Sequence, residues 1–309
     1  MAMITDMPPQ SGRLQHLGVL RFTGADSLSF LQGQLSNDTR RLAENRTLLA
    51  AYSNPQGRVM ALMHLLPHSS GTIAILPREL AAPTLEGLRR FVLRAKVKME
   101  DASEALAISG RHGEDGLRSA GIAAPQFPGY AEHDGIGVAA VDGSSHRCWL
   151  VGAADKIASR GLLGDEAHLR QIEHDWRLAD IRAGLPQIYL TTRETFVAQM
   201  LNLDLLDGIS FSKGCYTGQE IIARTQNLGR IKRRLHRLQL PHGEWSVGQP
   251  LRLRDGRAGR LTEVAAYGGG SEALAVLNLQ PTVAGPDGES QDAAAPDALD
   301  AFELPIPYT

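Results

Sequence analysis

A thiol, an ammonium group and a carboxylate lie close together in one short stretch of the sequence. Cys215 stands two residues after Lys213 and five before Glu220. Thr217 and Glu220 have the spacing of a capping box, and the apolar residues after them predict a helix to about Gln226. The N-terminus of a helix favours an anion, and Lys213 adds a second positive charge nearby. We therefore expect Cys215 to favour its thiolate form.

The two cysteines of the chain are far apart, at positions 148 and 215. They make neither a disulfide framework nor a self-sufficient metal site, so we expect a protein of the reducing cytoplasm. Free cysteines are often buried, and an inert packing role is the alternative for Cys215. For Cys148, within a strand-like run, burial is the expectation. The histidines form no His-Glu-x-x-His pair, and we expect no metal site.

Composition predicts a globular protein of several packed subdomains. The chain has 309 residues, of which 43% are hydrophobic, and its formal net charge is −2. That charge gives no general attraction to polyanions. Two basic runs, 89–98 and 224–237, are typical of solvated faces but also suit a polycarboxylate or RNA phosphates. Residues 1–10 lack the pattern of a signal peptide, and no apolar run is long enough to span a membrane.

Hydrophobic periodicity predicts the elements that position the cysteine stretch. A strand over 17–23, a helix over 27–35 and a hairpin over 47–66 are followed by an amphipathic helix over 83–95. Further strands and short helices come next, and a longer helix is expected from 166 to about 182. Trp176 on that helix offers a flat face to a heteroaromatic ligand, with a core position as the alternative.

The remaining residues predict a small all-β unit and a tail. Strands are expected over 230–240, 251–254, 257–266 and 273–278. Residues 283–300 are rich in Ala, Pro, Gly, Asp and Glu and predict a flexible, dispensable tail, after which residues 304–308 could dock again. We accordingly divide the chain into an N-terminal α+β part, a second α+β unit with the cysteine motif, a small all-β unit and a tail, at 1–103, 104–229, 230–282 and 283–309.

Residues 208–220, with the sequence Gly-Ile-Ser-Phe-Ser-Lys-Gly-Cys-Tyr-Thr-Gly-Gln-Glu, resemble the signature of the YgfZ-type folate-binding proteins. These proteins are relatives of the glycine-cleavage T-protein, an aminomethyltransferase. Residues 22–38, 54–59 and 181–186 resemble three further segments of the family. The resemblance extends from about residue 14 to 280, and the cysteine motif is highly specific.

The resemblance implies an α+β fold in which three domains form a ring around a channel, with a small C-terminal β-barrel. The channel would hold tetrahydrofolate or a one-carbon derivative. Cys215 and Lys213 would carry the chemistry, and their surround would be Tyr216, Gly218, Gln219, Glu220 and Arg224. The folate-lining elements of the family correspond here to Trp176, Leu17 and Arg182.

The function implied is that of an accessory protein in the maturation or repair of iron-sulfur proteins, and thereby in tRNA modification. Its partners would be folate and iron-sulfur client proteins, with direct RNA contact left open. A folate-dependent one-carbon transferase and a non-catalytic, ligand-gated scaffold are the alternatives. The transferase has acidic residues where Arg58 and Arg182 stand here, so whether the protein is an enzyme stays open.

Overall fold

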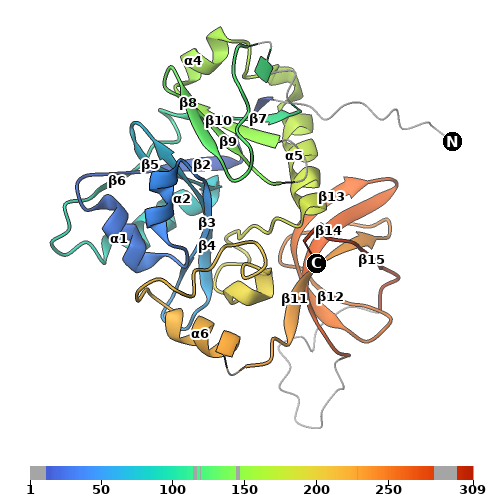
Figure 1. The fold of residues 1–309 in the computed structure, drawn as a ribbon. Helices are drawn as coiled ribbons and strands as arrows, with labels where there is room; N and C mark the ends of the chain where they lie inside the picture. The colour runs from blue at the N-terminus through green and yellow to red at the C-terminus, as the bar shows by residue number, and fades with distance from the viewer. Residues whose placement is uncertain are drawn as a thin grey trace.

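The computed structural model describes residues 12–113, 117–118, 120–143, 147–227, 229–281 and 298–308. Three antiparallel five-stranded sheets dominate this part of the chain. In Figure 1 they occupy the left, the top and the right of the molecule. The fold is therefore a mixed α and β fold, as the sequence predicted.

The first sheet is the best covered of the three. Its strands, in spatial order, are β3 (Leu48–Ser53), β4 (Val59–His68), β5 (Gly71–Pro77), β2 (Leu17–Thr23) and β6 (Lys98–Asp101). Strand β4 is almost continuously apolar because both faces of the sheet are buried. One face packs on the helices α1 (Ser27–Gln34) and α2 (Ala81–Arg89), and the short 3-10 helices are η1 (Thr39–Glu44) and η2 (Arg78–Leu80).

The second sheet shares a hydrophobic core with the other face of the first. Its order is β1 (Gly12–Arg13), β7 (Ala107–His112), β10 (Arg147–Gly152), β9 (Ile136–Ala140) and β8 (Tyr130–His133). The helical elements that follow are α4 (Ala154–Ser159), η3 (Glu166–His168) and α5 (Leu169–Ala183). Gly110 on β7 leaves room for Trp176 of α5, whose ring would lie 2.4 Å from a Cβ at that position.

The third sheet is open, whereas the sequence predicted a barrel. Its order is β12 (Pro250–Arg252), β13 (Ala258–Tyr267), β14 (Gly270–Asn278), β11 (Arg233–Leu240) and β15 (Phe302–Leu304). In the described residues its two edges are joined only by an isolated parallel bridge from Leu253 to Leu299. Strand β12 is too short to close the barrel by a full ladder.

The cysteine motif belongs to the core of the first sheet, although the sequence assigned it to the second unit. Residues 188–227, which include η4 (Ala198–Leu201) and α6 (Gln219–Asn227), contribute Phe196, Leu203 and Ile222 to that core. The physical reason is long-range packing of apolar side chains, which sequence order does not reveal. Figure 1 shows α6 below strands β3 and β4.

The C-terminal residues 298–308 pack on the molecule, so the predicted flexible tail does not extend to them. Strand β15 pairs with β11, and Ile306 is 7% exposed. The hydroxyl of Tyr308 donates to the carbonyl of Gly184, 2.6 Å away. Gly184 has a φ of 68°, and its missing side chain leaves the space that Ile306 and Tyr308 fill. Residues 283–297 of the predicted tail lie outside the described residues, as does the segment 1–10.

We predict that the C-terminal contact stabilises the fold. Ile306→Ala should lower the free energy of unfolding by about 2 kcal/mol or more, because the side chain is buried against the end of α5. Urea unfolding measures the change. Phe302→Ala is the control, since this larger side chain is 67% exposed and its loss should cost less than about 1 kcal/mol. Equal stability of the Ile306 variant and the parent would refute a packed C-terminus.

Candidate functional site

Cys215 is exposed, and Cys148 is buried on β10 at 2% exposure. The burial that the alternative expected for Cys215 is therefore wrong. The thiol lies in a loop four residues before α6, so a partner can reach it from solvent. The residues on either side of the thiol hold this loop in place.

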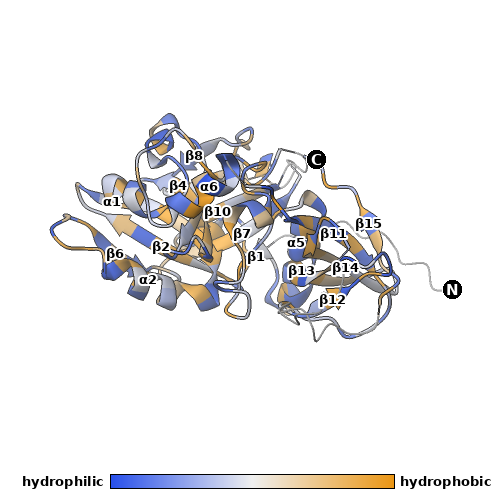
Figure 2. Ribbon diagram, turned by 90° about the horizontal axis from the view of Figure 1, so that it is seen from below, coloured by the Kyte–Doolittle hydropathy of each residue, from blue (hydrophilic) through white to orange (hydrophobic). Residues whose placement is uncertain are grey.

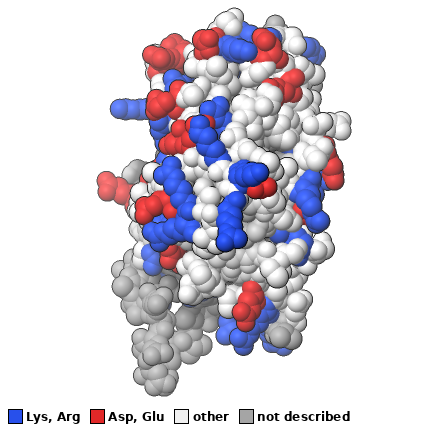
Figure 3. Space-filling model, turned by 90° about the vertical axis from the view of Figure 1, so that its left-hand side faces the viewer, with Lys and Arg blue, Asp and Glu red and all other residues white. Residues whose placement is uncertain are grey.

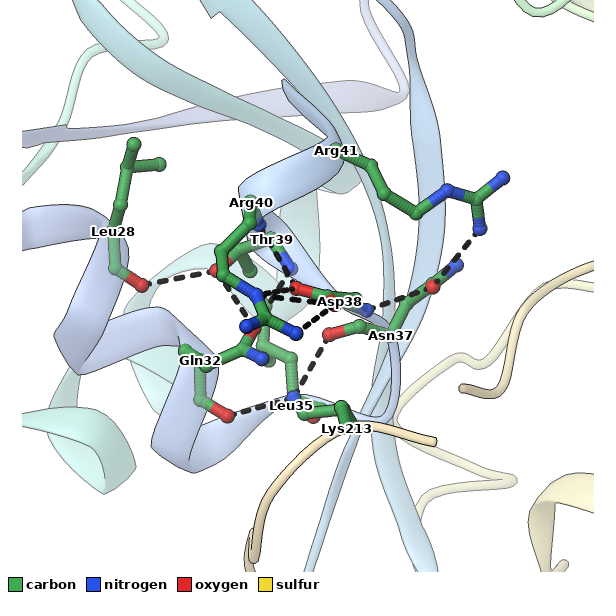
Figure 4. A network of polar contacts seen from close by, with 9 residues as sticks. All are labelled: Leu28, Gln32, Leu35, Asn37, Asp38, Thr39, Arg40, Arg41 and Lys213. Carbon is green, nitrogen blue, oxygen red and sulfur yellow. Dashed lines mark hydrogen bonds and ion pairs between the residues drawn. The ribbon is translucent and has the colours of Figure 1, made fainter. Parts of the chain in front are cut away.

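Lys213 fixes the loop to the end of α1. Its ammonium Nζ donates to the carbonyls of Gln32, Leu35 and Asn37 over 2.6, 2.6 and 2.8 Å (Figure 4). These carbonyls belong to the last turn of the helix and the turn after it, where main-chain acceptors lack helical partners. Burial lowers the pKa of Lys213 to about 8.

This arrangement changes the role expected for Lys213. An ammonium group has three donors, and all three are used on main-chain oxygens. Lys213 therefore positions the thiol loop and has no proton left to donate to a reaction at Cys215. Its ring contact is with Tyr216, whose centroid lies 4.9 Å from Nζ.

The turn that receives Lys213 also reaches the centre of the molecule. The side chain of Asn37 donates to the carbonyls of Leu49 and Asp207 over 2.8 and 2.6 Å. Asp38 accepts from the backbone and the guanidinium of Arg40, which lowers the pKa of the Asp38 carboxyl to about 2. Figure 4 shows these side chains around the end of α1. One turn thus joins the thiol loop to β3 and to residue 207.

Two glycines hold the other end of the thiol loop against the β3–β4 hairpin. Gly218 has a φ of 83°, and a Cβ there would lie 2.6 Å from the carbonyl oxygen of Asn54. Gly57 has a φ of 70°, and a Cβ there would lie 2.9 Å from the side chain of Ile221 on α6. Both positions need glycine for backbone conformation and for space.

We predict that Gly218→Ala destabilises the protein by about 2 kcal/mol or more, because the new methyl group meets the Asn54 carbonyl in a strained backbone conformation. Gly214→Ala is a matched control in the same loop. No atom lies within 4 Å of a Cβ at Gly214, so the change should stay within about 0.5 kcal/mol. Chemical unfolding of both variants compares them, and equal losses would show that the Gly218 contact has no such role.

The other motif residues have separate places. Tyr216 is 8% exposed in the first core, and burial raises the pKa of its hydroxyl to about 12. The helix begins at Gln219, whose side-chain oxygen accepts from the N–H of Tyr216 at 3.3 Å, in place of the expected Thr217–Glu220 capping box. Glu220 and Arg224 are exposed on α6.

A cavity of about 440 Å³ lies between the first sheet, the second sheet and the C-terminal segment. Its size is in the range of small-molecule sites, about 300–1,000 Å³. Most of its wall is apolar. The lining residues are Arg46, Thr47, Leu48, Leu49, His64, Phe127, Pro128, Val141, Asp142, Gly143, Ala183, Leu185, Leu205, Leu206, Asp207, Pro307 and Tyr308.

The three residues predicted to line a folate site do not line this cavity. Trp176 is 1% exposed and packs beside Trp149, with the guanidinium of Arg147 over its ring. Leu17 is buried in the same core. Arg182 pairs with Glu272 at 2.9 Å and stacks on Tyr267. Trp176 is therefore a core residue, the alternative that the sequence left open.

The cavity offers a few polar groups at defined places. His64 is 7% exposed and is held edge-on against Trp149, with ring centroids 4.6 Å apart. Burial lowers the pKa of His64 to about 4, so the ring is neutral at physiological pH. Asp142 pairs with Arg147 at 2.8 Å, and Asp207 pairs with Arg41 at 2.6 Å. Arg46 adds a cation to the wall.

Sequence reasoning missed these lining residues. They come from seven separate stretches of the chain, and no local pattern links them. Only the isolated polar residue His64 within an apolar strand gave a signal that could have been followed.

We predict a pH-dependent contribution of His64 to stability. The unfolded side chain takes up a proton below about pH 6.5, while the folded one does so only near pH 4, so stability falls as pH drops through this window. The loss should approach about 3 kcal/mol. Urea unfolding of His64→Gln between pH 7.5 and 4.5 should show a shallower fall than the parent. The exposed His242→Gln should leave the fall unchanged. A parallel pH dependence of parent and His64 variant would contradict this.

Among the described residues, no group of three or more His, Cys, Asp or Glu side chains could hold a metal ion. In the same part of the chain, no helix is long and apolar enough to cross a membrane.

The chain is similar to several bacterial proteins named tRNA-modifying protein YgfZ. That of Hamiltonella defensa is 31% identical over 274 residues, covering 86% of this chain and 79% of the relative. That of Pectobacterium carotovorum is 32% identical over 248 residues, covering 77% and 73%. That of Escherichia coli strain SE11 is 31% identical over 255 residues, covering 78% and 75%. No protein-family model matches the chain.

A solved structure shares the fold. The glycine cleavage system aminomethyltransferase T from Bartonella henselae superimposes with a TM-score of 0.61 over 87% of this chain and 78% of its own. The sequences are 12% identical, so this likeness concerns the fold. It confirms the predicted relation to the T-protein fold.

Proposed function

Because the chain belongs to the YgfZ family, we propose that it is a folate-binding accessory protein that acts in tRNA modification through the maturation or repair of iron-sulfur proteins. Tetrahydrofolate or a one-carbon derivative occupies the central cavity, within a ring of three domains. Cys215 is the functional thiol. Iron-sulfur client proteins in the cytoplasm are the partners.

The observation that carries the proposal is the central cavity. A folate has a flat pterin, an aromatic linker and a carboxylate tail, so it needs apolar walls, neutral hydrogen-bonding groups and a cation. Leu48, Leu49 and Val141 supply apolar wall. His64 is a neutral ring that borders the cavity, and no hydrogen bond of its ring nitrogens occurs within the described residues. Arg46 can meet a carboxylate. The donor set therefore fits a folate.

When bound, the folate would supply the capacity to carry a one-carbon unit. The chain's residues would bind and orient it: the leucines exclude water, and His64 hydrogen-bonds a polar ring edge. Leu49 and Asp207 line the cavity and also accept hydrogen bonds from Asn37, whose own carbonyl accepts from Lys213. This hydrogen-bonded path supports a link between cavity occupancy and the thiol loop.

A folate-dependent one-carbon transferase is the second candidate, favoured by the likeness to the aminomethyltransferase fold. The charges argue for the accessory role. A transferase needs a free carboxylate as a base, but Asp142 and Asp207 in the cavity wall are both paired with arginines. Arg58 stands where the transferase has an acidic residue, and its guanidinium donates to the Thr195 carbonyl.

We predict that filling the cavity abolishes folate binding. Leu49→Trp should weaken binding of 5-formyltetrahydrofolate, measured by calorimetry, by at least about tenfold, because the larger ring occupies ligand space. Leu190→Trp is the control, since Leu190 is 52% exposed and does not line the cavity. A parent protein that does not bind the folate, or equal binding by both variants, would refute the cavity as the site.

The thiol is tested separately. Cys215→Ser should bind the folate like the parent but fail to restore iron-sulfur enzyme activity in a cell that lacks its own family member. Cys148→Ser should restore it. Full activity of Cys215→Ser would favour the ligand-gated scaffold, and turnover of an aminomethyl donor by the purified parent would favour the transferase.

A further inference from the structure

The segment 89–98 projects from the first sheet, between α2 and β6, and we call it the basic spur. The sequence predicted helix to residue 95, but α2 ends at Arg89. Its last turn tightens through bonds from Phe91 to Leu88 and from Val92 to Arg89, and the chain then returns as β6. Figure 2 shows this segment extending from the end of the molecule beside β6, with hydrophobic colour along it.

The basic spur carries five cations and no acidic residue: Arg89, Arg90, Arg94, Lys96 and Lys98. All five are exposed. Arg90 pairs with Glu86, and Lys98 with Glu100. The other three have no ion pair within the part of the chain that the structure describes. In Figure 3, Lys and Arg gather across the middle of the face that carries α1, α2 and β6. A chain with a net charge of −2 thus concentrates positive charge locally.

Two large apolar side chains lie among these cations. Phe91 is 42% exposed and Leu93 is 88% exposed. Their neighbours Val92, Ala95 and Val97 point the other way and pack against the first core. The alternation leaves one face of the spur anchored and one face free.

The backbone of the spur is held in position. The N–H of Lys96 donates to the carboxylate of Asp26 at 2.7 Å, and the Asp26 N–H donates back to the Lys96 carbonyl at 3.3 Å. Gly24 leaves room for that carbonyl, which would lie 2.1 Å from a Cβ. Phe91 and Leu93 are therefore presented on an ordered support, which lowers the cost of binding.

We propose that the basic spur binds single-stranded RNA. Cations that follow a backbone and an aromatic side chain that stacks on a base are the common elements of single-strand sites. The face of Phe91 can reach an unpaired base but not one stacked within a duplex. A protein partner would need a wider apolar core than two side chains offer. The inference goes beyond the proposed function and does not depend on the cavity ligand.

The position of the spur relates it to the thiol. Asp26, at the start of α1, contacts the spur, while Lys213 holds the other end of the same helix. Eight helical residues span about 12 Å. An RNA strand seated on the spur can therefore follow α1, past the partly exposed Leu28, toward the loop that carries Cys215.

We predict that the full-length protein binds a fluorescent oligouridylate, measured by anisotropy, more tightly than an RNA duplex of equal length. Phe91→Ala should weaken binding by about 5- to 100-fold through loss of base stacking, and Phe91→Trp should preserve it. Arg94→Ala with Lys96→Ala should reduce the slope of log affinity against log salt by about 1.4. Leu93→Ala removes a side chain that is 88% exposed and is not needed for folding, so a loss of RNA affinity in this variant reports on the binding surface.

Arg230→Ala with Lys232→Ala is the matched control, because it removes two exposed cations from the other basic run. It should leave affinity and salt slope unchanged, and circular dichroism should show every variant folded. Equal loss in the control, equal affinity for duplex and single strand, or absence of binding would overturn the proposal. So would binding of the parent to anionic phospholipid vesicles with the same dependence on Phe91, since the spur would then be a membrane contact.

Discussion

The buried ammonium of Lys213 is the interaction on which the candidate site depends. A charged group removed from water is unfavourable unless every donor finds an acceptor, and three carbonyl oxygens satisfy this requirement. Those carbonyls in turn lack helical partners because α1 ends there. The same contact therefore provides hydrogen-bond partners both for the ammonium and for the carbonyls, and it brings together segments about 180 residues apart. The lowered pKa of Lys213 records how far it is removed from solvent.

The cavity and the thiol are separate places that share one wall. Cys215 does not line the cavity, but Leu205, Leu206 and Asp207, which precede its loop, do. The turn around Asn37 also joins that loop to the cavity wall. Such a division suits a protein that senses a small ligand on one side and meets a macromolecule on the other. Tyr308, next to the end of the chain, also lines the cavity, so a third part of the chain borders the same space.

Much of the local structure followed from the sequence. The helix at 27–34, the hairpin around Gly57 and the helix α5 were predicted close to their observed bounds, because each has a clear period and turn or capping residues. What failed depends on contacts between distant segments. Trp176 has an ordinary amphipathic setting, and only the glycine at 110 on another strand makes its burial necessary. The docking of Ile306 depends on Gly184 in the same way, and the cavity wall has no local signature at all.

The paired glycines 57 and 218 have a consequence for how the thiol is used. Gly218 meets the backbone of Asn54 and Gly57, and Gly57 meets the β-branched side chain of Ile221, so the two surfaces are in close contact. With Lys213 fixing the opposite end, the loop moves only as the hairpin beneath it moves, and that hairpin belongs to a sheet buried on both faces. Cys215 is thus held at a fixed position on the first sheet and does not lie on a mobile loop. A partner of the proposed thiol would therefore have to bring its own group to Cys215.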